Sequence, residues 1–198
     1  MSGGPDLAAA ADVVASDGLV IYPTETVYGL GADALEPDAV ERVFEAKGRD
    51  RSKPLSLGVP DVERALEYVH ASERERQFMR AFLPGPVTVV LERRETVPDI
   101  LTSGRERVGI RVPDHHLARE LLARTGPLTA TSANVSGRPS ATRVADVDPE
   151  IREVSGAILD GGETAGTAST VVDVAAGEIY RHGTSVDAVE RWLRERSE

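Results

Sequence analysis

The sequence predicts an α/β protein in which helices pack on a β-sheet. Short runs rich in β-branched residues alternate with longer segments of helical periodicity, and polar loops of small residues follow several of the runs. The 198 residues suffice for one ordinary domain, and no internal repeat, low-complexity tract or linker-like change of composition interrupts them. We therefore expect a single domain over residues 1–198.

The elements follow one another in a regular order. The N-terminal half is expected to contain helix 5–16, strand 19–22, helix 37–46, strand 54–59 and helices 61–69 and 72–82. The C-terminal half is expected to continue with strands 86–92 and 107–112, helix 115–124, strands 127–131, 156–160, 170–174 and 178–181, and helix 185–196. Asp6, Asp38, Asp61 and Ser185 lie at or near helix starts, where their side chains can cap free amide groups.

Two stretches, 132–143 and 161–169, are too rich in glycine, serine and threonine to belong to a core. Each follows a predicted strand, and ligands of α/β proteins usually bind at loops where strands end. We expect both stretches to be functional loops.

Composition excludes several kinds of site. The absence of cysteine excludes disulfides, thiolate catalysis and cysteine-ligated metals, and the four histidines lack the spacing of common zinc motifs. No segment approaches the roughly 18 apolar residues of a membrane-spanning helix. The N-terminus does not resemble a secretory signal, so we expect a cytoplasmic protein without a membrane partner.

The formal net charge of −10 disfavours tight binding to nucleic acid, because that affinity depends on cationic side chains that neutralise phosphates. Any contact with RNA is therefore expected to be weak or indirect. Such acidity would also suit a salt-rich cytoplasm, where surface carboxylates keep proteins in solution. Loss of folding or activity at low salt would support that hypothesis.

The basic segment 47–54 is the most informative feature, because the only two lysines of the chain, Lys47 and Lys53, both lie in it. A lysine ammonium suits phosphate oxygens as a point charge, whereas the guanidinium of Arg49 offers a planar pair of donors. The segment predicts an anion-binding clamp, although a solvated basic loop remains the alternative. No Walker P-loop is present.

Two further segments concentrate polar groups after strands. Residues 22–31 place hydroxyls, a carboxylate and glycines in what we expect to be a strand-to-helix turn. Residues 131–140 offer Ser132, Asn134 and Ser140 as hydrogen-bond partners for a nucleotide or a magnesium-bound phosphate. Ordinary turn chemistry explains both segments equally well.

Together with three more blocks, these segments resemble the YrdC-like threonylcarbamoyl-AMP synthases. The additional blocks are 83–88 (Leu-Pro-Gly-Pro-Val-Thr), 108–115 (Val-Gly-Ile-Arg-Val-Pro-Asp-His) and 169–173 (Ser-Thr-Val-Val-Asp). Six blocks in the family's order make chance similarity very improbable. The resemblance covers residues 18–181 and implies a twisted, open, mixed sheet with flanking helices, in the short single-domain form.

The resemblance also implies an activity. L-Threonine, bicarbonate or CO2, and ATP would give threonylcarbamoyl-AMP and pyrophosphate, the first step of N6-threonylcarbamoyladenosine modification of tRNA, with Mg2+ assisting and a downstream transferase complex receiving the product. The implied ATP contacts are Lys47, Arg49, Lys53, Ser132, Asn134, Ser140 and Arg181, of which Lys47, Arg49, Ser132 and Asn134 would be catalytic. The implied threonine contacts are Thr26, Arg111, Ala130 and Ser169. No metal ligand is assigned.

Three positions depart from the family's usual pattern. Asp50 replaces a proline, Gly58 replaces a histidine that contacts threonine in many members, and Arg107 replaces a threonine. Two alternatives therefore stay open: synthesis of a related acyl or carbamoyl adenylate, and a non-catalytic module of the same fold that binds double-stranded RNA or tRNA.

Overall fold

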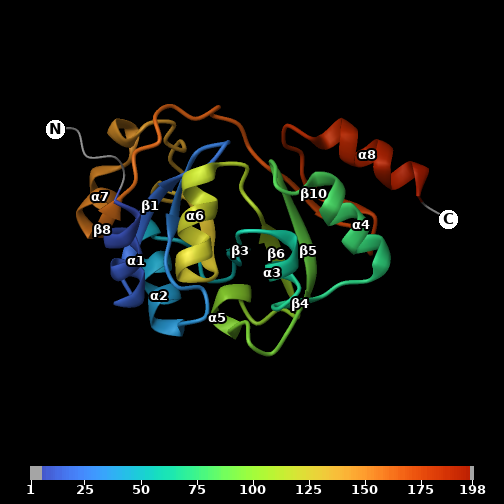
Figure 1. The fold of residues 1–198 in the computed structure, drawn as a ribbon, viewed down its shortest axis with the longest axis horizontal. Helices are drawn as coiled ribbons and strands as arrows, with labels where there is room; N and C mark the ends of the chain where they lie inside the picture. The colour runs from blue at the N-terminus through green and yellow to red at the C-terminus, as the bar shows by residue number, and fades with distance from the viewer. Residues whose placement is uncertain (1–5, 197–198) are drawn as a thin grey trace.

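The computed structural model describes residues 6–196 and contains a mixed, ten-stranded sheet flanked by helices (Figure 1). The strands are β1 (Leu19–Pro23), β2 (Tyr28–Gly31), β3 (Ser56–Gly58), β4 (Val69–His70), β5 (Val87–Arg93), β6 (Arg107–Arg111), β7 (Leu128–Ser132), β8 (Ser155–Ile158), β9 (Thr170–Asp173) and β10 (Glu178–Arg181). Their order is β10-β9-β5-β6-β3-β7-β2-β1-β8, and β4 pairs with β5 outside this path. Three pairs are parallel (β1–β8, β3–β6 and β5–β9), and the other pairs in the described sheet are antiparallel.

The helices are α1 (Leu7–Ala15), α2 (Pro37–Lys47), α3 (Val62–Ala65), α4 (Glu73–Phe82), α5 (Asp99–Thr102), α6 (His116–Thr125), α7 (Pro149–Val154) and α8 (Val186–Glu195), with a 3-10 turn at Val144–Asp146. Asp6 and Asp61 cap α1 and α3 through side-chain oxygens, as predicted. Asp38 lies in the first turn of α2, whereas Ser185 makes no side-chain cap. None of the helices within 6–196 combines the length and apolar character needed to cross a bilayer.

The predicted fold class is confirmed, and most predicted elements are present with small shifts of their ends. Three predictions were wrong in detail. The expected helix 61–69 is one short helix followed by β4, the short helices α5 and α7 were not predicted, and residues 22–31 form a β-hairpin instead of a strand-to-helix turn. Pro5, where the first helix was expected to begin, lies outside the described residues.

The hairpin was missed because β2 contains two glycines, which weaken a strand pattern. The structure supplies the reason for both. A Cβ at Gly29 would approach the Tyr22 ring to 3.0 Å, and a Cβ at Gly31 would approach it to 2.9 Å. The glycines therefore leave room for the Tyr22 ring, whose hydroxyl donates a hydrogen bond to the backbone oxygen of Thr129 at 3.3 Å.

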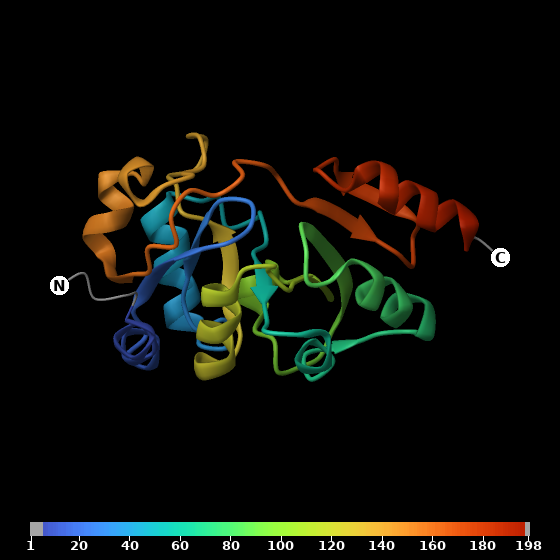
Figure 2. The same ribbon diagram turned by 45° about the horizontal axis from the view of Figure 1, so that its top comes forward.

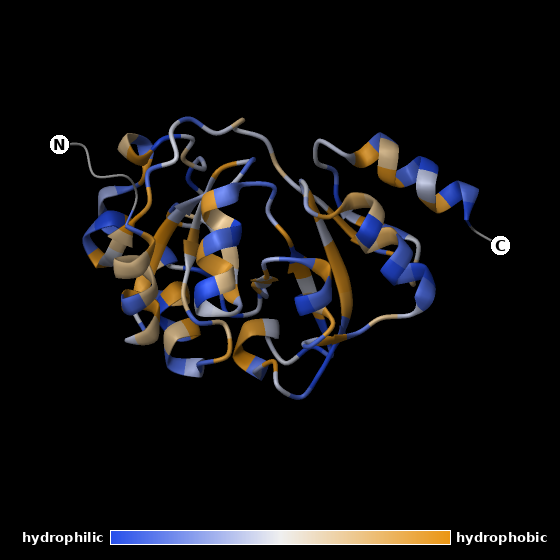
Figure 3. Cartoon of the chain, in the orientation of Figure 1, coloured by the Kyte–Doolittle hydropathy of each residue, from blue (hydrophilic) through white to orange (hydrophobic). Residues whose placement is uncertain are grey.

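The sheet has a buried core on both faces, and β1 shows how the sequence achieves this. Val20 and Tyr22 pack against α1 and α6, whereas Leu19 and Ile21 belong to the larger core on the opposite face. Successive side chains of a strand point to opposite faces, so an uninterrupted apolar run fits a strand covered on both sides. Figure 3 shows hydrophobic residues concentrated along the strands.

The far end of the sheet is covered by α4 and α8. The ring of Trp192 meets Phe78 edge-on, with ring centroids 4.9 Å apart. A capping box between Ser72 and Glu75 fixes the start of α4. Trp192 is the only tryptophan of the chain, so its fluorescence reports on this packing.

A segment that we call the strap, residues 160–169, crosses from β8 at one edge of the sheet to β9 near the other edge (Figures 1 and 2). It is anchored to the hairpin, because Gly166 N donates to Thr26 O at 2.7 Å and the Tyr28 hydroxyl donates to Gly162 O at 2.7 Å. The strap therefore brings the polar residues at its C-terminal end close to the hairpin.

Candidate functional site

A cleft of about 800 Å³ lies between the hairpin, the central strands and the strap. Eight of the residues predicted for the site line it: Thr26, Arg49, Arg111, Ala130, Ser132, Ser140, Ser169 and Arg181. Lys47, Lys53 and Asn134 are not among the lining residues. The two loops expected to be functional both contribute to its wall.

The cleft is strongly cationic although the protein is acidic. Among the described residues that line it are five arginines and one carboxylate: Arg49, Arg105, Arg107, Arg111, Arg181 and Glu106. Arg107 is paired with Asp173 at 2.8 Å and Arg111 with Glu25 at 2.6 Å. The other three arginines make no ion pair within residues 6–196, so they are available to an anionic ligand.

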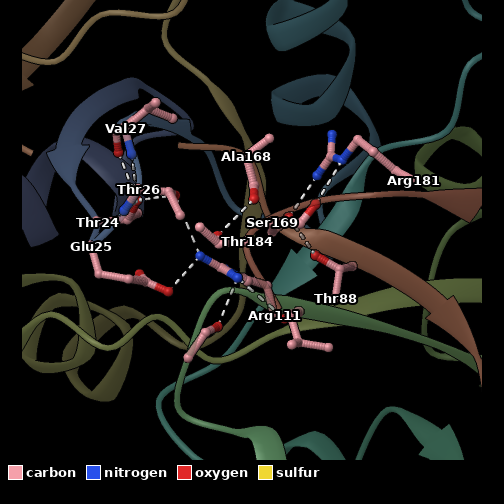
Figure 4. A network of polar contacts seen from close by, with 12 residues as sticks. Thr24, Glu25, Thr26, Val27, Thr88, Arg111, Ala168, Ser169, Arg181 and Thr184 are labelled. Atoms are coloured by element: carbon pink, nitrogen blue, oxygen red, sulfur yellow. Dashed lines mark hydrogen bonds and ion pairs between the residues drawn. The ribbon is translucent and has the colours of Figure 1, made fainter. Parts of the chain in front are cut away.

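Arg111 is held at the end of β6 by four hydrogen bonds (Figure 4). Its Nη1 donates to the backbone oxygens of Gly85 at 2.7 Å and Val87 at 3.2 Å, and its Nη2 donates to Glu25 at 2.6 Å and to Thr26 Oγ1 at 3.4 Å. Burial lowers the pKa of Arg111, and the Glu25 carboxylate partly opposes that shift. The guanidinium is therefore a fixed, charged group facing the hairpin.

Ser169 links two strands of the cleft wall. Arg181 donates to the Ser169 backbone oxygen at 2.9 Å and to its Oγ at 2.6 Å, while Thr88 Oγ1 lies 3.2 Å from the same Oγ. The register of β10 on β9 sets Arg181 opposite Val171, two residues from Ser169. Sheet pairing therefore brings together two residues separated by a turn in the sequence.

Lys47 is buried and is not among the residues that line the cleft. Its side chain is 1% exposed, and its Nζ donates to the backbone oxygens of Ser132 and, at 2.7 Å, Asn134. Ser136 N donates in return to Lys47 O at 2.8 Å. Lys47 therefore fixes the loop after β7 to the end of α2. Burial lowers its pKa to about 8, with the charge of Arg49 as a second cause.

Arg49 reaches the cleft because α2 ends at Gly48, whose φ of 53° reverses the chain. Its guanidinium donates to the backbone oxygens of Lys53 at 3.0 Å and Pro54 at 2.9 Å. Burial, followed by the charge of Arg181, lowers the pKa of Arg49. These two arginines thus lie close enough to repel, which an anion between them would relieve. Lys53 is exposed outside the lining.

The loop after β7 is ordered by Asn134, which is 6% exposed. Its amide nitrogen donates to the backbone oxygens of Val135 at 2.8 Å and Arg138 at 2.9 Å, and its Oδ1 lies 3.5 Å from Ser140 Oγ. Ser132 and Ser140 line the cleft on either side of this turn. Residues 131–140 therefore form a hydrogen-bonded turn that also presents two serines to the cleft, so the turn interpretation and the binding interpretation are compatible.

Three polar residues of the site had no role assigned from sequence: Thr24, Glu25 and Thr88. Thr24 closes the hairpin, with Oγ1 donating to Val27 O at 2.6 Å, and Glu25 pairs with Arg111. All three lie inside the sequence blocks singled out above, so a signal was present. Their partners are 86 and 81 residues away for Glu25 and Thr88, and only the tertiary structure identifies them.

Two of the departures from the family's pattern lie in the cleft, and both have a structural setting. Arg107 is neutralised by Asp173. A Cβ added at Gly58 would fit without a clash, because its nearest atoms would be 3.4–3.7 Å away, at ordinary van der Waals distance. Asp50 makes a local turn by accepting from Ser52 N at 2.9 Å. No group of three or more histidine, aspartate or glutamate side chains suited to a metal occurs within residues 6–196.

Gly183→Ala is expected to displace the backbone at the end of the strap, next to Ser169 of the cleft wall. A Cβ at Gly183 would overlap the backbone of Ala168, Ser169 and Thr170, so the strap must move. Overpacking of this kind costs about 1–3 kcal/mol of stability. We expect the variant to unfold at lower urea concentration, followed by Trp192 fluorescence, with Gly58→Ala as the control that has room for its methyl group. Identical unfolding curves for wild type and Gly183→Ala would contradict this packing.

Comparison with known proteins decides the family. A family model for Sua5/YciO/YrdC, described as telomere recombination, matches residues 12–183. The chain belongs to the Sua5/YciO/YrdC family. The six sequence blocks and the fold they implied are thereby confirmed as those of this family.

Relatives with curated names support the same assignment. A threonylcarbamoyl-AMP synthase of Pyrococcus abyssi is 42% identical over 169 residues, which are 83% of this chain and 49% of that protein. A putative threonylcarbamoyl-AMP synthase of Methanocaldococcus jannaschii is 34% identical, covering 89% of this chain and 84% of that one. The chain thus spans about half the length of the P. abyssi relative.

A solved structure resembles the fold directly. P. abyssi Sua5 in complex with L-threonine superimposes with a TM-score of 0.85 at 38% identity, covering 92% of this chain and 56% of that one. The sheet and its flanking helices are therefore those of a Sua5-type structure.

Proposed function

We propose that this protein is an L-threonylcarbamoyladenylate synthase, a nucleotidyltransferase that joins L-threonine, bicarbonate or CO2, and ATP. The observation that carries this proposal is the cationic cleft, which Arg49 and Arg181 both line without an ion-pair partner in the described chain. Relatives named as synthases of this adenylate, and a relative's structure with L-threonine, agree with such a ligand.

In this proposal the phosphates of ATP bind at the side of the cleft formed by the basic segment and the loop after β7. The ATP contacts would be Lys47, Arg49, Lys53, Ser132, Asn134, Ser140 and Arg181. Four of these line the cleft. Lys47 and Asn134 would act by positioning the loop from beneath, and Lys53 would reach in from the exposed rim.

The threonine would bind at the opposite side, near the hairpin. Its contacts would be Thr26, Arg111, Ala130 and Ser169, all of which line the cleft. Arg111 would pair with the carboxylate of the amino acid in exchange for its ion pair with Glu25, since a guanidinium with fixed orientation binds a carboxylate in a defined geometry.

The proposed reaction has two steps. The amine of threonine forms a carbon–nitrogen bond with bicarbonate, releasing water and giving a carbamate. A carbamate oxygen then attacks the α-phosphorus, and the bond to the bridging oxygen of the β-phosphate breaks, releasing pyrophosphate. No protein nucleophile is needed, so positioning and stabilisation of phosphate charge supply the catalysis.

Mg2+ would accompany ATP as a phosphate-bound ion, which is common because this ion retains waters and few protein ligands. The hydroxyls of Ser132 and Ser140 fit that role, because both residues line the cleft and offer neutral oxygens. The ion would offset negative charge on the phosphates.

The described residues would act as one catalytic unit, in the cytoplasm, with a tRNA-modifying transferase complex as the recipient of the product. Contact with RNA would be weak or indirect because of the net charge of −10. The product is an activated intermediate for the modification of a tRNA adenosine next to the anticodon.

Binding of ATP is expected to weaken above about pH 8. The pKa of Lys47 is lowered to about 8 by burial, so Lys47 loses its proton as the pH rises through that value. The positive charge of Lys47 beneath the loop favours the binding of phosphate, so loss of this one proton predicts a decline in affinity of up to about tenfold per pH unit above that value. Titration of ATP between pH 7 and 9.5 measures this, and Lys53→Ala should keep the same slope. A flat profile would contradict the role of Lys47.

Pyrophosphate release with ATP, Mg2+ and bicarbonate, with and without threonine, tests the function when the adenylate is identified by mass. Threonine-dependent release together with threonylcarbamoyl-AMP is expected. Serine and related amino acids, tried in the same assay, test the space at Gly58. Release that depends on another amino acid would replace threonine as the substrate, and absence of release from folded protein would refute adenylate synthesis.

A further inference from the structure

Arg105 is a cleft arginine to which neither the sequence blocks nor the proposed contacts give a role. It lines the cleft beside the basic segment. Its Nη2 donates to the backbone oxygen of Ser52 at 3.2 Å, and Ser103 Oγ donates to Arg51 O at 2.5 Å. The segment 103–105 therefore docks on the loop that carries Arg49 and Lys53.

The chain is bent to make this contact. Helix α5 ends at Ser103 with φ 56°, and Gly104 follows with φ 74°, so two successive residues have left-handed conformations. Gly104 N donates to Asp99 O at 2.9 Å, which closes the helix end. The reversal brings Arg105 back toward the basic segment instead of continuing along the helix axis.

The charge of Arg105 is not used within the described part of the chain. Several other exposed arginines are ion-paired, as in Arg51–Glu41, Arg64–Glu67 and Arg124–Glu120, whereas Arg119, outside the cleft, has no ion pair in the described chain. For Arg105 the structure gives one hydrogen bond to a carbonyl oxygen and no ion pair among residues 6–196. In a chain with 33 acidic residues, an arginine left unpaired beside two other unpaired cleft arginines points to an anionic ligand.

The position of Arg105 indicates which part of the ligand it meets. Strand β6 begins at Arg107 and ends at Arg111, so Arg105 and Arg111 are six residues apart, and their Cα atoms lie at most about 20 Å apart at the rise of an extended chain. An in-line displacement places the nucleophile and the leaving group on opposite sides of the phosphorus. With the carbamate at the Arg111 end, the leaving group faces the Arg105 end.

We propose that Arg105 binds the β- and γ-phosphates of ATP, the part that departs as pyrophosphate, together with Arg49 and Lys53. This inference rests on the proposed function for the direction of the ligand. Negative charge develops on the bridging oxygen as its bond to the α-phosphorus breaks. Arg105 stabilises that charge, so it contributes to turnover as well as to binding.

The test compares three ligands in Mg2+ buffer by calorimetry: ATP, inorganic pyrophosphate and AMP. Arg105→Ala is expected to weaken ATP and pyrophosphate about tenfold, equivalent to one charge-assisted hydrogen bond, and to leave AMP unchanged. Arg105→Lys keeps the charge and is expected to stay within about threefold of wild type. Arg119→Ala is the matched control, because Arg119 is exposed, lies outside the cleft and likewise donates to one backbone oxygen, that of Pro60.

The outcomes separate this inference from the proposed function. Wild-type affinity of Arg105→Ala for pyrophosphate would overturn the inference alone. Equal weakening of AMP and pyrophosphate would also overturn it, because Arg105 would then act only by supporting the loop through Ser52. If wild-type protein bound neither ATP nor pyrophosphate, the proposed function and the inference would fail together.

Discussion

Lys47→Ala is expected to reduce adenylate formation by about 10²–10³-fold, the usual effect of removing one preorganised electrostatic group. The Lys47 ammonium binds two backbone oxygens of the loop after β7, so its removal releases Ser132 and Asn134. The loss should appear in pyrophosphate release at saturating threonine, with a higher KM for ATP and an unchanged KM for threonine.

The same variant is expected to lose about 1–3 kcal/mol of stability, because two carbonyl groups beneath the cleft lose their donor. Urea unfolding followed by Trp192 measures this, since that side chain packs on Phe78 at the far end of the sheet. Lys47→Met fills the space of the lysine side chain but has no hydrogen-bond donor, so it should lose activity and stability as Lys47→Ala does. Wild-type stability of both variants, with lost activity, would show that Lys47 contacts the ligand without supporting the loop.

Arg111→Ala is expected to raise the KM for threonine at least about a hundredfold, because truncating a desolvated charge typically costs 2–5 kcal/mol. Arg111 is 7% exposed and oriented by Gly85, Val87 and the hairpin. The dissociation constant of ATP should change less than about threefold, because the phosphates are proposed to bind at the other side of the cleft. Arg111→Lys should not restore threonine binding, since one ammonium cannot replace the planar donor set.

A double variant separates threonine binding from the cost of an unpaired charge. Arg111→Ala leaves the Glu25 carboxylate, 18% exposed, without its ion-pair partner. Arg111→Ala combined with Glu25→Ala should recover stability on the order of 2–3 kcal/mol, yet keep the high KM for threonine. Recovery of threonine affinity in the double variant would instead mean that Arg111 serves only to neutralise Glu25.

The hairpin at residues 22–31 is a feature that the sequence pattern did not predict. Residues 22–31 were recognised as a polar segment with hydroxyls and a carboxylate, but their strand was missed because its glycines resemble turn residues. Gly29 and Gly31 are needed because the Tyr22 ring lies against them. A requirement for empty space beside a ring on the paired strand has no periodicity that a sequence pattern could reveal.

Sequence by itself determined the α/β class, most strands, the caps of α1 and α3, and the segments that form the cleft, because these depend on local periodicity and on side-chain chemistry. The tertiary structure decided which cations are free and which are already paired. Lys47 is buried beneath the loop, Arg107 and Arg111 have carboxylate partners, and Arg105 has none in the described chain. Such pairing depends on strand order and register, which bring together residues far apart in the chain.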